Sequence, residues 1–81
     1  MGKTEFLLLV DELLDLDAGT LKGSEALEAL AGWDSMAVIG FMALADEQLG
    51  VRLRPAKMAG CTTLDDLIGL CGSRVRQEAH V

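Results

Sequence analysis

The stretch that decides the fold is Gly32-Trp33-Asp34-Ser35-Met36, together with the apolar run that follows it to Leu49. A serine stands where a glycine-containing loop gives way to a predicted helix over residues 35–49, which Gly50 ends. One stripe of this helix has core spacing and is expected to face inward: Val38, Phe41, Met42, Ala45 and Leu49. We expect Trp33 to anchor the preceding loop on this core.

A second stripe on the opposite side of the same helix is largely uncharged. It consists of Met36, Ile39, Gly40, Ala43 and Glu47, and Asp46 adds a charge at its far end. A chain of 81 residues has little material with which to bury a helix on every side. We therefore expect this outer face to be available to partner proteins.

Apolar periodicity predicts two more main helices and one short one. The first helix is expected from Glu5 to about Leu16, with Thr4 as its cap. Its predicted core stripe is Phe6, Leu9, Val10, Leu13 and Leu14. Leu7 and Leu8 fall outside that stripe, so the helix is apolar on more than one side.

The connection over residues 20–34 is long for a compact helical domain, and a short helical turn is expected within residues 24–30. Pro55 begins a single turn that ends at about Gly60. Thr62 or Thr63 caps a last helix whose predicted core stripe is Leu64, Leu67, Ile68 and Cys71. The prediction is one all-α domain over residues 1–81, a small four-helix bundle with a core over about 4–72 and a flexible tail over 73–81.

The charge of the chain limits its partners. The formal net charge is −6, with −8 over residues 1–47 and +2 over residues 48–81. An acidic surface repels phosphate backbones, so we expect no nucleic-acid partner. The early apolar run from Phe6 to Val10 is too short for a secretion signal or a membrane span, so we expect a cytoplasmic protein. We also expect it to be a monomer.

The sequence offers neither a metal site nor a catalytic constellation. Cys61 and Cys71 stand ten residues apart, the only histidine is His80, and both cysteines are expected to be small buried hydrophobes. Ser35 lacks a surrounding Gly-x-Ser-x-Gly turn, and His80 falls in the expected tail, so a Ser-His-Asp nucleophile is not supported. We expect a protein that is not an enzyme.

Several segments resemble the acyl carrier protein family. Asp34-Ser35-Met36 is similar to the family's Asp-Ser-Leu motif, with Met in place of Leu. Gly32-Trp33 and the run from Val38 to Leu49 are similar to the entry and the body of the family's second helix. Leu49-Gly50-Val51-Arg52-Leu53 is similar to the end of that helix and the apolar anchor after it, and Thr62-Thr63-Leu64 is similar to the start of the last helix. The resemblance spans most of the chain in the right order.

The resemblance implies an acyl-carrier-like bundle with a covalent 4'-phosphopantetheine arm on Ser35. A phosphopantetheinyl transferase would attach the arm from coenzyme A with magnesium, and Asp34 would help the transferase recognise the serine. Acyl cargo would be carried as thioesters, to be loaded and processed by enzymes of fatty-acid, polyketide or other specialised biosynthesis. The partner contacts implied are Met36, Ile39, Gly40, Ala43, Asp46 and Glu47, and the apolar interior is where many members shelter a chain.

The sequence also departs from typical fatty-acid carriers. Ala37 and Gly40 occupy positions that are often acidic there, and three basic residues, Arg52, Arg54 and Lys57, follow the helix. Our hypothesis is a specialised free-standing carrier. Two alternatives stay open, namely an aminoacyl or peptidyl carrier that shares the fold and the modified serine, and an unmodified helical interaction module in which Ser35 merely caps a helix.

Overall fold

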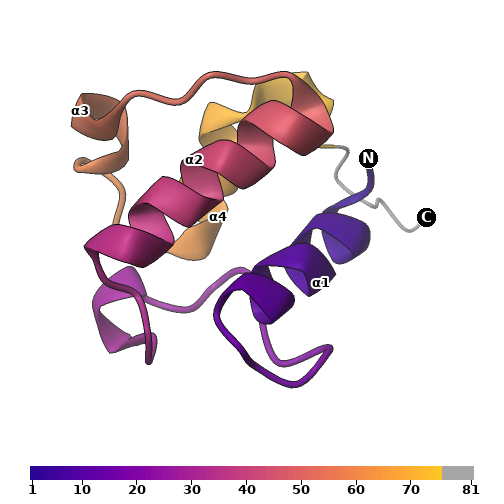
Figure 1. Ribbon diagram of the computed structural model, residues 1–81, viewed down its shortest axis with the longest axis vertical. Helices are drawn as coiled ribbons and strands as arrows, with labels where there is room; N and C mark the ends of the chain where they lie inside the picture. Colours follow the sequence, from indigo (N-terminus) through magenta and orange to yellow (C-terminus); the bar gives the residue numbers. More distant parts are fainter. Residues whose placement is uncertain (76–81) are drawn as a thin grey trace.

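The computed structural model describes residues 1–75, with the Ser73 side chain left aside (Figure 1). Within that part of the chain there are four α-helices and no strand, which confirms the predicted all-α bundle. The helices are α1 (Lys3–Leu13), α2 (Ser35–Leu49), α3 (Pro55–Met58) and α4 (Leu64–Leu70), with 3₁₀ turns η1 (Leu27–Ala29) and η2 (Gly72–Arg74). The turn η1 lies within the range where a short helical turn was expected.

Helix α2 has the predicted bounds, and both of its ends are fixed by local chemistry. The Asp34 carboxylate accepts a hydrogen bond from the Ala37 N–H at 2.9 Å, which satisfies a backbone donor of the first turn. Gly50 adopts the left-handed conformation with φ 68°, which glycine allows without steric cost. In the predicted inner stripe Phe41, Ala45 and Leu49 are buried, while Val38 and Met42 are half-buried.

Helix α1 begins and ends earlier than predicted. Gly2, rather than Thr4, precedes its first turn, and its N–H donates to the Glu5 carboxylate at 3.4 Å. The helix stops at Leu13 instead of Leu16 because Asp15 turns to a positive φ of 59°.

The core face of α1 is also rotated relative to the prediction. Its buried residues, with the following Leu14, are Phe6, Leu7, Val10, Asp11 and Leu14. Leu9 is only half-buried and Leu13 is 36% exposed, so both were wrongly assigned to the core. The buried face includes a carboxylate, because Asp11 lies on the same side of the helix as Leu7 and Leu14 and is buried with them.

Asp11 holds the first half of the long connection. Its side chain is 1% exposed, and it accepts hydrogen bonds from the Gly19 N–H at 2.9 Å and the Leu21 N–H at 3.0 Å. These bonds satisfy two backbone donors of a segment that has no regular secondary structure of its own. They place the buried Leu21 against the core.

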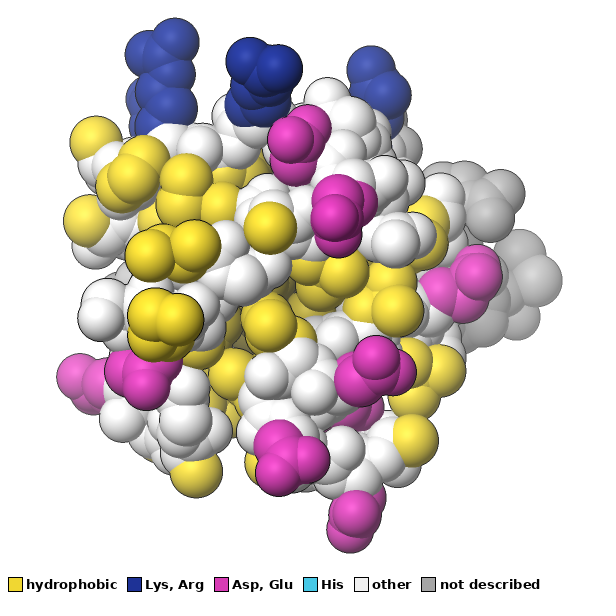
Figure 2. Space-filling view, in the orientation of Figure 1, with side chains coloured by type: hydrophobic (Ala, Val, Ile, Leu, Met, Phe, Trp, Pro, Cys, Tyr) yellow, Lys and Arg dark blue, Asp and Glu magenta, His cyan; other side chains and the backbone are white. Residues whose placement is uncertain are grey.

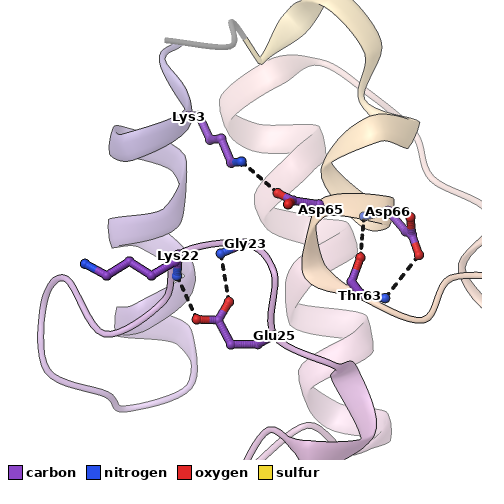
Figure 3. A network of polar contacts seen from close by, with 7 residues as sticks. All are labelled: Lys3, Lys22, Gly23, Glu25, Thr63, Asp65 and Asp66. Atoms are coloured by element: carbon purple, nitrogen blue, oxygen red, sulfur yellow. Dashed lines mark hydrogen bonds and ion pairs between the residues drawn. The ribbon is translucent and has the colours of Figure 1, made fainter. Parts of the chain in front are cut away.

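The second half of the connection is bonded to the start of α4, and Figure 3 shows polar contacts around this junction, among them the ion pair of Lys3 with Asp65. The Asp65 N–H donates to the Gly23 carbonyl at 2.7 Å, and the Leu64 N–H donates to the Glu25 carbonyl at 3.1 Å. Lys3 and Asp65 form an ion pair at 2.8 Å. Gly23 has φ +114°, and a Cβ there would overlap the Asp65 carboxylate, so only glycine fits this crossing.

Helix α4 carries the predicted cap and core stripe. The Thr63 hydroxyl accepts from the Asp66 N–H at 3.2 Å, and the Asp66 carboxylate accepts from the Thr63 N–H at 3.1 Å, which makes a capping box. Leu64, Leu67, Ile68 and Cys71 are all buried.

The packed part of the chain extends beyond the expected limit of residue 72. Val75 is 2% exposed, and the Arg74 guanidinium donates to the Leu49 carbonyl at 3.3 Å. The first part of the predicted tail therefore belongs to the folded domain. Residues 76–81, where the rest of that tail was predicted, lie outside the described residues.

Two carboxylates make the fold sensitive to acid. Backbone N–H groups of Thr62 and Thr63 lower the pKa of Asp66 below its ordinary value of 3.8. Burial raises the pKa of Glu25, but backbone hydrogen bonds, chiefly from Lys22 and Gly23, outweigh it and lower this pKa below 4.5. A carboxylate whose pKa is lowered on folding contributes stability that is fully present above its unfolded pKa and is lost as the pH falls through the folded pKa.

We therefore expect the urea midpoint to fall as the pH is lowered below about 4.5, and further below about 3.8. The double variant Glu25→Gln/Asp66→Asn should show a flatter pH profile, measured by circular dichroism at constant ionic strength. Glu28→Gln is the control, because it removes an exposed carboxylate that accepts no hydrogen bond within residues 1–75. A double variant with the same acid dependence as the wild type would contradict this assignment.

Candidate functional site

Ser35 is exposed and is the first residue of α2. The backbone before it is held by a tight turn, in which the Trp33 N–H donates to the Leu30 carbonyl at 3.2 Å and the Asp34 N–H donates to the Gly32 carbonyl at 3.0 Å. Since Asp34 supplies the side-chain cap of the helix, the Ser35 hydroxyl is not needed for capping. The structure thus presents one hydroxyl to solvent on a fixed backbone.

Trp33 anchors this turn on the core, as predicted. Its ring meets the Phe41 ring edge-on with the centroids 5.9 Å apart, and Phe6 meets Phe41 in the same way at 5.6 Å. Such edge-to-face pairs stabilise by about 1 kcal/mol beyond the area that they bury. The chain of three rings connects α1 to the loop in front of Ser35.

A largely apolar pocket of about 590 Å³ borders the first turn of α2. Four segments of the chain contribute to it: the end of the long connection, α2, α3 and the approach to α4. Its lining residues are Ala26, Leu27, Glu28, Trp33, Val38, Pro55, Met58, Ala59, Cys61, Thr62 and Thr63. Sequence reasoning expected an apolar interior but did not identify these residues, because the pocket is formed by segments that meet only in the fold.

The two cysteines differ in their surroundings. Cys71 is buried as predicted, but Cys61 is half-buried and lines the pocket, so the expectation of a buried side chain was wrong for Cys61. Burial and the nearby Asp66 charge raise the pKa of the Cys61 thiol, and burial raises that of Cys71. Both thiols are therefore protonated at neutral pH. Within residues 1–75 no group of three candidate ligands could hold a metal ion.

The outer face of α2 is exposed over most of its length. Met36 is 73% exposed and Ile39 is 60% exposed. Of the other residues expected there, Ala43, Asp46 and Glu47 are exposed.

Two small residues of α2 are covered to different degrees, and of these only Gly40 was expected on the open outer face. Gly40 is half-covered, because Leu13 of α1 lies over it. Ala37 is buried at 8% exposure, so its lack of charge reflects core packing and not a loss of acidity from the outer face. The absence of an acidic residue at position 37, one of the departures from typical fatty-acid carriers, is thus explained by the burial of this position.

A comparison with protein-family profiles places these features in a known family. Residues 5–71 match the family described as "Phosphopantetheine attachment site". The chain belongs to this phosphopantetheine attachment site family. Comparisons with curated proteins and with solved structures gave no significant match.

The cofactor of this family is 4'-phosphopantetheine, which is attached covalently to the carrier domain. Carrier domains of this family typically have no catalytic activity of their own. Their interactions are with the enzymes that modify them and process what they carry. No helix among residues 1–75 is long and apolar enough to cross a membrane.

The residues at the start of α2 fit such a cofactor. The Ser35 hydroxyl is exposed, so an arm can be attached without opening the core. A phosphodiester at this position would lie at the positive end of a fifteen-residue helix, which favours negative charge. The pocket next to this turn offers apolar surface to whatever the arm carries.

Proposed function

We propose that this carrier domain transports acyl groups as thioesters on a 4'-phosphopantetheine arm attached to Ser35. The observation that supports this most strongly is an exposed hydroxyl on the first residue of α2, with the helix capped by a different residue, Asp34. Coenzyme A would supply the arm through a phosphopantetheinyl transferase. In that reaction the Ser35 oxygen loses its proton and bonds the transferred phosphate, while the nucleotide portion of coenzyme A leaves.

Asp34 is proposed as the residue that positions Ser35 for the transferase. Its carboxylate holds the first turn of α2 through the 2.9 Å bond to the Ala37 N–H. It is itself exposed, so a partner can contact it next to the serine. The proposed docking face continues along α2 through Met36, Ile39, Ala43, Asp46 and Glu47, with Gly40 as a half-covered member.

The pocket supports a role in covering cargo. It borders Ser35 through Trp33 and Val38, and most of its exposed surface is apolar. Cys61 lines it as a protonated thiol, which attacks a thioester far less readily than a thiolate does. The arm, when bound, supplies the thiol that carries the acyl group.

The pathway is proposed to be a specialised one in the cytoplasm. Arg52, Arg54 and Lys57 are exposed and give the segment between α2 and α4 a basic edge, visible at the top of Figure 2. Acidic side chains lie on α1, at Glu5 and Glu12, and at the end of α2, at Asp46 and Glu47. A partner has to match both charges, which favours a dedicated enzyme over a uniformly basic one.

Incubation with coenzyme A, magnesium and a promiscuous phosphopantetheinyl transferase tests the proposal. The intact mass should increase by one phosphopantetheine, and by one only. An unchanged mass with a transferase that modifies a known carrier in the same reaction would contradict the function.

Loading of the modified protein then tests the cargo class. We expect an acyl transferase of a dedicated pathway to load it, and a general malonyl transferase of fatty-acid synthesis to load it poorly. Efficient loading by the general enzyme alone would contradict the specialised pathway. Loading by an adenylating enzyme with an amino acid would assign the domain to the aminoacyl carriers instead.

A further inference from the structure

Helices α1 and α2 enclose a shallow surface groove of about 330 Å³. We call it the α1–α2 groove. Its lining residues are Leu9, Glu12, Leu13, Gly40, Ala43, Leu44, Glu47 and Gln48. Figure 2 shows hydrophobic side chains gathered between the two helices, with acidic side chains on both sides of them.

The groove exists because the two helices approach closely at a glycine. A Cβ at Gly40 would lie 2.6 Å from Cδ1 of Leu13, so the missing side chain makes room for this leucine. Leu13 nevertheless remains 36% exposed, and the neighbouring Leu9 and Leu44 are half-buried. The contact between the helices therefore leaves apolar surface that a partner side chain can cover.

The rims of the groove carry one sign of charge. Glu12 on α1 and Glu47 on α2 are both exposed, and neither lysine nor arginine lines the groove. A second copy of this chain would bring acidic rims together, and residues 1–47 already carry a net charge of −8. Charge complementarity thus favours a basic partner.

We propose that the α1–α2 groove binds an amphipathic helix of a partner protein, with an apolar anchor side chain flanked by Lys or Arg. This rests on the proposed carrier function, because the partner would hold the domain while acting on the group attached at Ser35. Ala43 lies eight residues after Ser35, which corresponds to about 12 Å along the helix axis. A helix in the groove therefore leaves the modified serine accessible.

The test uses a synthetic helical peptide with a leucine stripe flanked by lysines, titrated into the ¹⁵N-labelled protein at low salt. We expect amide shifts in residues 9–13 of α1 together with residues 40–48 of α2. Glu12→Lys should weaken binding about fivefold, and the loss should shrink at high salt. Asp17→Lys is the matched control, because it makes the same charge change in the first loop, outside the groove lining, and should change affinity less than twofold.

Several results would overturn the groove. One is that a peptide with glutamates in place of the lysines binds with the same affinity. Another is that the amide shifts are confined to α2 and none occurs in α1. A third is that Glu12→Lys and Asp17→Lys change the affinity for the peptide equally. Self-association that Glu12→Lys abolishes would assign the groove to a second copy and overturn it as well. Treating the same samples with the transferase separates the two proposals. Protein that gains the arm but does not bind the peptide refutes only the proposal of a binding groove. Protein that fails to gain the arm refutes the carrier function.

Discussion

Ser35→Ala is expected to abolish phosphopantetheine addition completely while leaving the helical content unchanged. The first expectation follows because alanine offers no oxygen to the transferase. The second follows because Asp34 caps α2, Ser35 is exposed, and alanine is the best helix former. Intact mass spectrometry and far-ultraviolet circular dichroism measure the two outcomes on the same sample.

The sequence contains two other serines, Ser24 and Ser73, and Ser24 serves as the control. Ser24 is exposed in the long connection and does not begin a helix. Ser24→Ala should therefore be modified like the wild type. Arm addition to Ser35→Ala would place the attachment elsewhere, and loss of helical content in that variant would contradict the description of the cap.

Asp11→Ala is expected to destabilise the domain by about 3 kcal/mol, because it leaves two backbone N–H groups without their acceptor. These are the Gly19 and Leu21 donors at 2.9 and 3.0 Å. A domain of this size has a free energy of unfolding of roughly 4–12 kcal/mol, so the loss is a large fraction of the total. Thermal unfolding should shift down by about 15 °C.

Two variants separate the hydrogen bonds from other effects at this position. Asp11→Asn keeps the shape but turns an NH₂ group toward one backbone donor, so it should also be clearly destabilised. Glu12→Ala changes the neighbouring exposed residue and should stay within about 0.5 kcal/mol of the wild type. If Asp11→Ala were as stable as Glu12→Ala, Asp11 would not hold the connection.

The parts of the fold that depend on local chemistry could be predicted from the sequence. The bounds of α2 follow from Asp34 and Gly50, and the start of α4 follows from the Thr63 cap. The core face of α1 was not predicted correctly from apolar spacing, because one of the residues on that face is a buried carboxylate, Asp11. An aspartate within a helix is normally solvated. Only the fold shows that the Asp11 carboxylate accepts hydrogen bonds from the backbone N–H groups of Gly19 and Leu21.

The candidate site was predicted where it lies within one segment and missed where it lies between segments. Ser35, Met36 and Ile39 are exposed as the periodicity of α2 indicates. Leu9 and Leu13 were assigned to the core, although the surplus of leucines in α1 indicated more apolar surface than one face can bury. Their position beside Gly40 depends on how closely α1 approaches α2, which no local pattern contains.

The most direct test of the central claim is the position of the arm in the wild-type protein. Trypsin releases residues 23–52 as one peptide that contains both Ser24 and Ser35. After transferase treatment, fragment ions that contain Ser35 should carry the phosphopantetheine mass, and fragments that contain Ser24 alone should not. An arm on Ser24, on another peptide or nowhere in the protein would contradict the account.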